Sequence, residues 1–255
     1  MYAVYEEHEA FTPPTDPDIP VWRYMDFTKY VWLLDHEALF FTRADRLGDP
    51  FEGSYSAANV AARPELYGDR FDSMQERIQP FFEKLPQFTF VNCWHMNEVE
   101  SAAMWRLYLK SGEGVAVRST YRRLIESLAD YVPSVYVGEV KYIDYERDFI
   151  PEHNSFFPFV HKRRSFEHER ELRAVRQELA HATGTEHKQA PQYRLDAEAL
   201  ASGLTVPVRM TTLVERIYVA PGAPAWLREL VVSVTTKYGF PFEVNQSRLD
   251  ADPVY

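Results

Sequence analysis

The chain has 255 residues, of which 45% are hydrophobic, 26% charged and 15% aromatic, as expected for a globular protein of one large domain or two small ones. Its net charge of −10 argues against broad, non-specific binding to nucleic acid or to an anionic membrane. The single cysteine excludes an internal disulfide framework and a cysteine-rich zinc site, which fits a reducing compartment. The acidic amino terminus lacks an apolar core and no apolar run reaches membrane-spanning length, so we expect a cytoplasmic protein without a membrane partner.

The spacing of apolar residues predicts the order of helices and strands. Residues 1–20 are rich in proline and acidic residues, and we interpret them as a tail before the domain. The predicted elements in chain order are a strand at 21–25, a helix at 28–35, a strand at 38–43, a surface helix at 65–84, a strand at 88–94, a helix at 101–109, a strand at 114–119, a helix at 120–130, a long strand at 134–142, a helix at 159–167, strands at 171–176 and 216–220, a helix at 225–238 and a strand at 243–246. Because strands and helices do not alternate strictly, we predict a single α+β domain over residues 21–255, with a mixed, largely antiparallel sheet surrounded by helices.

The predicted strand-to-helix junction at residues 91–105 is the most informative segment of the sequence. It combines the only cysteine with a histidine, two carboxylates, two asparagines and two tryptophans. Ligands often bind between the carboxyl end of a strand and the amino end of a helix. The candidates for ligand contacts in this segment are Trp94, His95, Ser101 and Trp105. The structural alternative is that Asn97 and Glu100 cap the helix and that the tryptophans belong to the core.

Several blocks of the sequence resemble a bacterial family. The blocks are residues 22–25, 39–43 with 49–53, 93–105 with 114–116, 162–173, and 217–221 with 247–249. Together they resemble the family catalogued as domain of unknown function 2971, over roughly residues 20–255. The label of that family names no reaction, so the resemblance implies a bacterial domain without implying its activity.

The layout also resembles that of mono-ADP-ribosyltransferases, which have an early strand with a basic residue and a late strand with a catalytic glutamate. Arg23 takes the place of the early basic residue, and Glu169-Arg170-Glu171 takes the place of the late Glu-x-Glu motif. The central Ser-Thr-Ser-type motif of those enzymes has only a loose counterpart at residues 118–120. The resemblance implies that NAD is the substrate and that a nucleic acid or a protein accepts ADP-ribose, within a toxin or defence system.

The chemistry of ADP-ribose transfer explains why these residue types are needed. The ribose carbon becomes cation-like as nicotinamide leaves, and a fixed carboxylate stabilises that charge. We expect Glu171 to be catalytic and Glu169 to orient the acceptor, while Arg23 holds the pyrophosphate through paired hydrogen bonds. The candidate cofactor contacts besides Arg23 are Tyr24, Arg43, Trp94, His95, Ser101 and Trp105, of which the aromatic rings can stack on nicotinamide or adenine. We further expect Glu171→Gln to abolish NAD turnover with little change in melting temperature.

These charged residues also have a structural interpretation. Glu169, Glu171 and Arg173 can form a solvated strand face on which the arginine screens the acids. Arg23 can form an ion pair with Asp49 or Glu52 instead of binding a ligand.

Two other functions stay open at this point. The first is a non-catalytic module in which the aromatic residues and the junction recognise a nucleotide, a base or a partner peptide. The second is a metal-dependent nuclease, since Glu139-Val140-Lys141 matches part of a nuclease strand, with Asp49 or Asp130 as the upstream acid. The histidines have no known metal-ligand spacing, so we expect no metal site. The basic cluster at residues 162–164 can meet a phosphate or form a solvated turn.

Overall fold

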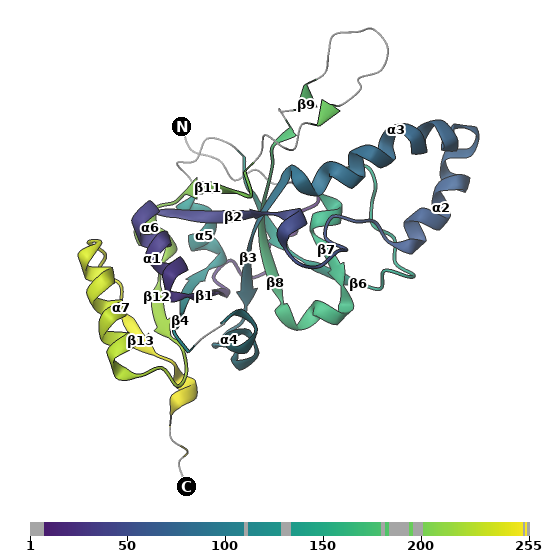
Figure 1. The fold of residues 1–255 in the computed structure, drawn as a ribbon. Helices are drawn as coiled ribbons and strands as arrows, with labels where there is room; N and C mark the ends of the chain where they lie inside the picture. The colour runs from purple at the N-terminus through teal and green to yellow at the C-terminus, as the bar shows by residue number, and fades with distance from the viewer. Residues whose placement is uncertain are drawn as a thin grey trace.

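The computed structural model describes residues 8–109, 112–128, 134–179, 182–183, 194–195, 201–251 and 253 (Figure 1). Its α-helices are α1 Phe27–His36, α2 Ala57–Tyr67, α3 Phe71–Lys84, α4 Ala102–Tyr108, α5 Tyr121–Ser127, α6 Met210–Leu213 and α7 Ala225–Lys237. Its strands are β1 Pro20–Asp26, β2 Ala38–Arg43, β3 Thr89–Met96, β4 Gly114–Thr120, β5 Tyr136–Glu139, β6 Lys141–Ile143, β7 His161–Arg163, β8 Glu171–Gln177, β9 Ala182–Thr183, β10 Arg194–Leu195, β11 Gly203–Pro207, β12 Arg216–Val219 and β13 Val244–Gln246.

β3 is the strand around which the main sheet is organised. Its side chains are buried almost throughout, because packed layers cover both faces of the sheet at this strand. One edge of β3 pairs with β8 over nearly its full length. The other edge pairs first with β2, at Val91 with Thr42, and then with β1, at His95 with Trp22. β1 and β2 therefore diverge along the middle of β3 and leave a gap in the sheet beside Cys93.

The remaining strands extend the sheet in both directions. The order β11-β2-β3-β1-β4-β12-β13 forms the main path, and β8 and β5 continue from the other edge of β3. The pairs are antiparallel except for β12 with β13, so the described part of the chain contains a mixed, largely antiparallel nine-stranded sheet. This confirms the predicted α+β class and the predicted character of the sheet.

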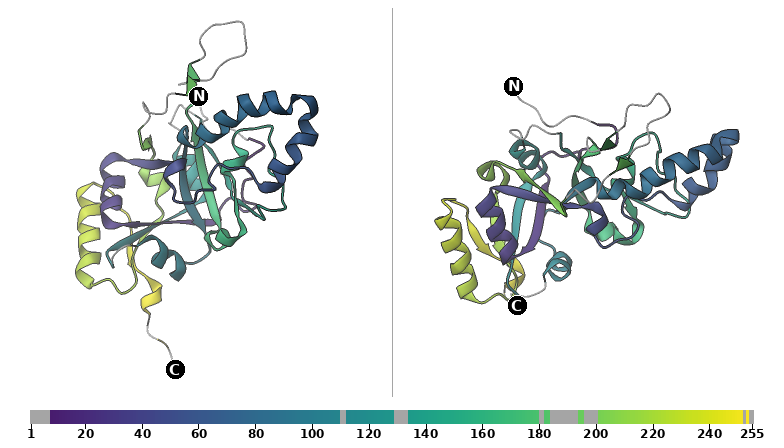
Figure 2. Two further views of the ribbon diagram at one scale, coloured as in Figure 1. Left: turned by 45° about the vertical axis from the view of Figure 1, so that its right-hand side comes forward. Right: turned by 45° about the horizontal axis from the view of Figure 1, so that its top comes forward.

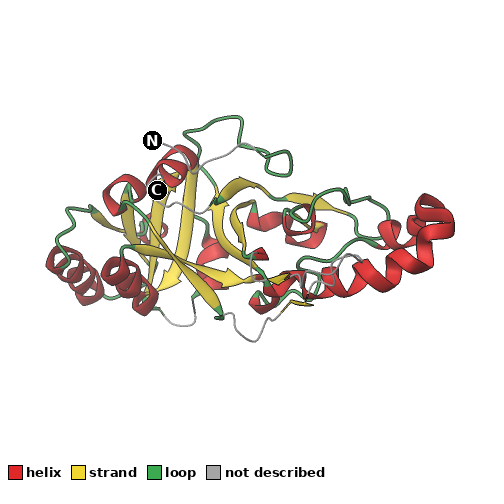
Figure 3. Ribbon diagram, turned by 90° about the horizontal axis from the view of Figure 1, so that it is seen from above, coloured by secondary structure: helices red, strands yellow, loops and turns green. Residues whose placement is uncertain are grey.

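Helices cover both faces of the sheet. Apolar residues of α1, α5 and α7 join the largest core cluster, with Tyr30, Leu124 and Val231 among its fully buried members. On the opposite face, Met104 and Trp105 of α4 pack in a second cluster with residues of β1, β4 and β12. The hairpin of α2 and α3 extends from the molecule at the end opposite to α7 (Figures 1, 2 and 3). No helix in the described ranges is long and apolar enough to span a bilayer.

Most strand and helix predictions agree with the structure, and the differences have local causes. The predicted surface helix at 65–84 is a hairpin of α2 and α3, because Gly68 takes a positive φ of 49° between them. The predicted long strand at 134–142 is interrupted at Val140, whose N–H donates to the carbonyl of Glu171. The predicted helix at 159–167 is instead the short strand β7 followed by a 3-10 helix at Arg164–Glu169. The backbone of this segment pairs with β6 at His161–Arg163, which takes these residues out of a helix.

The segment before β1 contributes to the core in its described part. Phe11, which the sequence analysis placed in a tail, is buried and packs with Val91, Val160 and Val175. Gly138 of β5 lies directly against the backbone of Phe11, where a β-carbon would come within 2.8 Å of its Cα. The domain therefore includes residues that precede position 21.

Candidate active site

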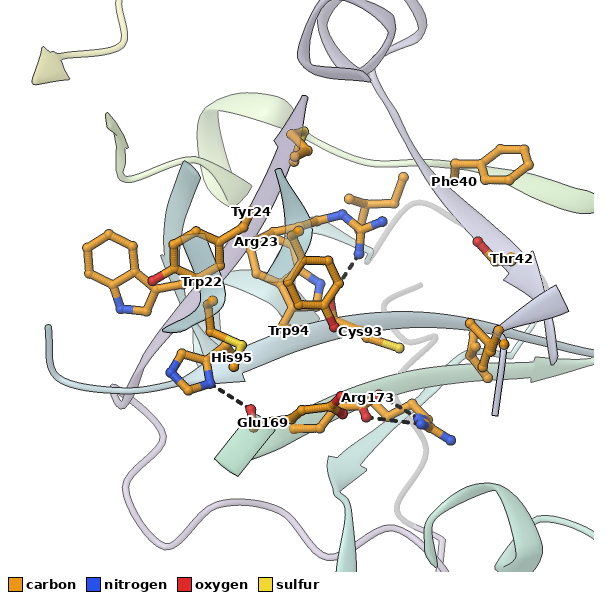
Figure 4. Close-up of a pocket in the computed structure, with 18 of the residues that line it drawn as sticks. Trp22, Arg23, Tyr24, Phe40, Thr42, Cys93, Trp94, His95, Glu169 and Arg173 are labelled. Carbon is orange, nitrogen blue, oxygen red and sulfur yellow. Dashed lines mark hydrogen bonds and ion pairs between the residues drawn. The ribbon is translucent and has the colours of Figure 1, made fainter. Parts of the chain in front are cut away.

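A cavity of about 630 Å³ lies where β1 and β2 diverge from β3 (Figure 4). Residues of β1, β2, β3, β7 and β8 line it, together with the loop that follows β2. Its volume lies within the range of ~300–1,000 Å³ that is typical of small-molecule sites. The predicted candidates that line it are Arg23, Tyr24, Trp94, His95, Glu169 and Glu171. The fold thus brings residues of the early and late strands together in one cavity.

Arg23 supplies a partly buried positive charge on the β1 side of the cavity. Its Nη1 donates to the carbonyl oxygen of Cys93 at 2.9 Å, and its guanidinium carbon lies 6.0 Å from the centre of the Trp94 ring. No carboxylate of the described residues pairs with Arg23, and burial lowers the pKa of its guanidinium. The alternative ion pair of Arg23 with Asp49 or Glu52 is absent among these residues, because those acids pair with other cations. The remaining N–H donors of Arg23 are available to an anionic ligand.

Arg173 is the centre of a buried ionic cluster on the opposite side. Its side chain is 0% exposed and uses all five N–H donors. It donates to both oxygens of Glu171 at 2.7 and 3.0 Å, to both oxygens of Glu52 at 2.8 and 3.0 Å, and to the carbonyl of Phe159 at 2.7 Å. The alternative of a solvated strand face is therefore wrong for Glu171 and Arg173.

Lys162 joins the same cluster from β7. Its Nζ donates to Glu169 Oε2 at 2.6 Å and lies 3.4 Å from Glu171 Oε2 and 3.7 Å from Glu52 Oε1. It also lies 4.7 Å from the centre of the Phe166 ring. Three carboxylates thus meet two cations here, so this wall of the cavity carries a net charge of −1.

The two glutamates of the Glu-x-Glu motif differ in how many of their carboxylate oxygens bond within this cluster. Glu171 is 4% exposed and both of its oxygens bond to Arg173. Burial alone would raise its pKa, but Arg173 and Lys162 hold the pKa of Glu171 at about 2. Glu169 is 9% exposed and uses only Oε2, while its Oε1 has no partner among the described residues. Glu169 is therefore the carboxylate that can contact a ligand.

The hydrogen bonds of Glu171 to Arg173 predict that the protein loses stability at low pH. Its folded pKa of about 2 lies below the ordinary value of 4.5, so its contribution to stability is present above pH 4.5 and disappears as the pH falls through 2. The difference corresponds to about 3 kcal/mol. Urea unfolding between pH 2 and 6 should show this fall in the wild type and a much flatter profile in Glu171→Gln, with a lower stability at pH 6. Parallel profiles in the wild type and Glu171→Gln would contradict the role of Glu171 in stabilising the fold. An unchanged melting temperature in Glu171→Gln, which the sequence alone predicted, would contradict it as well.

His95 and Tyr24 fix the backbone around the cavity. His95 Nδ1 donates to the carbonyl of Glu169 at 2.6 Å (Figure 4). Burial lowers the pKa of this imidazole, which therefore stays neutral near pH 7, and its Nε2 has no partner in the described part of the chain. Tyr24 accepts a hydrogen bond from the N–H of Ser101 at 2.8 Å, and burial raises the pKa of its hydroxyl. Both residues hold neighbouring segments at the cavity wall.

Three candidates do not line the cavity because nearby groups use their polar atoms. Arg43 binds both oxygens of Asp45, two residues along the chain. Ser101 caps α4 by accepting from the N–H of Met104, so the alternative in which Asn97 caps this helix is wrong. Trp105 donates to Glu100. Because these three residues do not line the cavity, their positions do not support the predicted role in cofactor binding.

Glu100 connects α4 to the C-terminal segment. Its carboxylate accepts hydrogen bonds from Trp105 Nε1 at 2.9 Å, from the Ser247 hydroxyl at 2.6 Å and from the Arg248 N–H at 2.5 Å. It therefore has a structural role and does not line the cavity.

This role predicts the effect of removing the charge of Glu100. Glu100→Gln should lower the free energy of unfolding by about 2 kcal/mol, because charged hydrogen bonds are lost in a buried place. The matched control is Glu98→Gln, whose side chain is exposed two residues earlier. Urea denaturation of both variants measures the difference, and equal stabilities would contradict the structural role.

The nuclease alternative gains no support from the geometry. Glu139 and Lys141 lie on different strands, β5 and β6, and neither lines the cavity. Asp130 lies outside the described residues. No group of three or more possible metal ligands occurs among the residues that the structure describes. Burial raises the pKa of the Cys93 thiol, which disfavours the reactive thiolate.

The candidate site residues from the sequence omit Glu52, Lys162, Tyr108 and Phe40, which also line the cavity. The sequence named Glu52 only as an alternative ion-pair partner of Arg23 and Lys162 only as part of the basic cluster at residues 162–164. Phe40 and Tyr108 are 38% and 44% exposed, so their rings offer more contact surface than the buried Trp94.

Comparisons with known proteins found no matching family model, no matching curated protein and no matching solved structure.

Proposed function

We propose that the protein is an ADP-ribosyltransferase-like enzyme that binds NAD in this cavity. One observation carries the proposal: Arg23, a partly buried cation without a carboxylate partner among the described residues, lines the same cavity as a cluster with a net negative charge. NAD carries both complementary charges, an anionic pyrophosphate and a cationic nicotinamide ring. The layout of an early arginine and a late glutamate, on which the resemblance to mono-ADP-ribosyltransferases rests, also supports the proposal.

Each side chain has a distinct role in the proposed complex. Arg23 binds the pyrophosphate through the N–H groups that it does not use for Cys93. Phe40 and Tyr108 stack against the planar rings, because both aromatic side chains line the cavity and are not fully buried. Glu169 lies beside the ribose and the nicotinamide, while Lys162 fixes its carboxylate.

The reaction breaks the bond between the ribose carbon and the nicotinamide nitrogen, and the bonding electrons leave with nicotinamide, which becomes neutral. The carboxylate of Glu169 stabilises the cation-like carbon. A nucleophilic atom of the acceptor, a nucleic acid or a protein, then bonds to this carbon and releases its proton to Glu169. In this proposal Glu169 takes the catalytic role, and Glu171 fixes the cluster through Arg173.

Arg23→Met tests the phosphate contact. We expect NAD affinity to fall about tenfold to hundredfold, because a hydrogen bond to a charged group contributes ~1.5–3 kcal/mol. The free energy of unfolding should stay equal or rise, since the partly buried charge has no carboxylate partner in the described residues. Calorimetric titration with NAD and urea denaturation measure the two effects.

Arg118→Met is the matched control for this test. Arg118 also lies against a tryptophan, 5.8 Å from the centre of the Trp22 ring, but it pairs with Glu215 and does not line the cavity. It should keep wild-type NAD affinity. A loss of affinity in both variants, or in neither, would remove the support for Arg23 as the phosphate ligand.

A nucleotide-binding module without catalysis is the second candidate. Both carboxylate oxygens of Glu171 bond to Arg173, which favours this second candidate, because a carboxylate held in this way is unavailable to a substrate. Binding of NAD with no release of nicotinamide, in the presence or absence of protein and nucleic-acid acceptors, would support this candidate over the enzyme.

A further inference from the structure

Two of the cations that line the candidate active site have no carboxylate partner among the described residues, and the proposed NAD complex uses only one of them. These two are Arg23 and Lys29. The other cations of the lining are held in ion pairs with aspartate or glutamate: Lys162, Arg163 and Arg173. Arg23 is assigned to the pyrophosphate, so Lys29 is a second cation that can meet an anionic group of the ligand.

Lys29 lines the cavity from α1, the helix that directly follows β1. Trp32 and Leu33, three and four residues further along the helix, line it as well, because this spacing places the three side chains on the same side of the helix. Lys29 is exposed, whereas Arg23 is half-buried. A charged group of the ligand that stays at the open side of the cavity can therefore reach Lys29.

Aromatic side chains lie next to Lys29 at this end of the cavity. Trp32 packs edge-on against Phe40 of β2, with 5.7 Å between ring centres. His36 stacks on Trp32 at 4.3 Å and supports its ring. Phe40 is not fully buried, so its ring offers a surface on which a flat heterocycle such as adenine can stack. This end of the cavity thus combines an aromatic surface with one cation.

The direction of a bound dinucleotide follows from the positions of the charged side chains, and this step rests on the proposed function. In Figure 4, Phe40 and Glu169 lie on opposite sides of Arg23. With the pyrophosphate at Arg23 and nicotinamide beside Glu169, the adenosine half extends toward Phe40 and α1. Lys29 then lies at the end of the cavity that receives the adenosine ribose.

We propose that Lys29 binds a phosphate on this ribose, so that the cavity takes the phosphorylated dinucleotide NADP in preference to NAD. Such a phosphate carries a charge of about −1.5 to −2 at pH 7, and a lysine ammonium pairs with it. Sites selective for NAD typically place an aspartate or glutamate at the ribose hydroxyl, which repels a phosphate there. The lining residues of the described elements α1 and β2 include no carboxylate. The acids of the lining follow β2 or lie in the segment from β7 to β8: Asp49, Glu52, Glu169 and Glu171.

Calorimetric titrations of the full-length protein with NADP and with NAD, at one ionic strength, test the preference. We expect NADP to bind the wild type about tenfold more tightly than NAD, because of the added charged contact. Lys29→Gln should remove this difference by weakening NADP alone, and its unchanged affinity for NAD shows that the cavity is intact. Lys237→Gln, in the last turn of α7 with an exposed side chain, is the matched control and should keep the wild-type preference.

The outcomes separate this inference from the proposed function. Binding of NAD with an equal or weaker affinity for NADP overturns the preference and leaves the NAD site in place. Binding of neither nucleotide overturns both proposals. A Lys29→Gln variant that still prefers NADP excludes Lys29 as the phosphate ligand. Equal loss of both affinities in that variant places Lys29 at the pyrophosphate and overturns its role at the ribose.

Discussion

Replacing Arg173 by methionine is expected to lower the free energy of unfolding by about 3–5 kcal/mol, because it leaves buried carboxylates without their partner. Arg173 is fully buried and provides the bidentate contacts to both Glu52 and Glu171. After the substitution, Lys162 is the one cation of the cluster that remains near these two acids. Urea denaturation at pH 7 measures the loss.

The control for this prediction is Arg216→Met. Arg216 lies 3.6 Å from Glu243, but both side chains are well exposed, so the change should cost less than about 1 kcal/mol. If Arg173→Met does not fold, the triple variant with Glu52→Gln, Glu171→Gln and Arg173→Met should restore a folded protein, since no unpaired charge is left. A loss below 1 kcal/mol in Arg173→Met would mean that the ionic cluster does not stabilise the fold as its geometry indicates.

Glu169→Gln is expected to reduce the release of nicotinamide from NAD at least a hundredfold. Removing one fixed electrostatic contact to the transition state typically costs a factor of ~10²–10³. Glu169 is the candidate because it lines the cavity and has one oxygen without a partner in the described residues. The substitution keeps the shape of the side chain, so NAD affinity should change much less than turnover.

Glu167→Gln is the matched control, because Glu167 lies two residues earlier with an exposed side chain. Chromatography of released nicotinamide, at saturating NAD, compares the two variants with the wild type. Equal turnover in Glu169→Gln and the wild type would remove Glu169 from the catalytic role. Loss of turnover together with loss of NAD affinity would indicate a binding contact instead.

The sequence predicts this fold well where the pattern is local. The short runs rich in apolar, aromatic and β-branched residues at β1, β3, β4 and β8 were sufficient to place these strands within one or two residues. Prediction failed at the segment containing β7, because Lys162 is buried by its partners and not by its own apolar character. No spacing along the chain indicates that environment.

The site was predictable only in part, because several of its contacts join residues that are far apart in the sequence. Arg23 and the Glu-x-Glu motif were found through their layout, and they do line one cavity. The pairing of Glu52 with Arg173 joins residues 121 positions apart, which a single sequence does not reveal. Arg43 and Trp105 were assigned to the site because of their residue types, but Asp45 and Glu100, which are close in the sequence, bind their polar groups.

The most direct test of the central proposal is a calorimetric titration of NAD into the wild-type protein, followed by a competition with ADP-ribose. ADP-ribose keeps the pyrophosphate that Arg23 is proposed to bind but lacks nicotinamide. The proposal predicts saturable one-to-one binding of NAD that ADP-ribose displaces. An absence of measurable binding at millimolar NAD would contradict the assignment of this cavity to NAD.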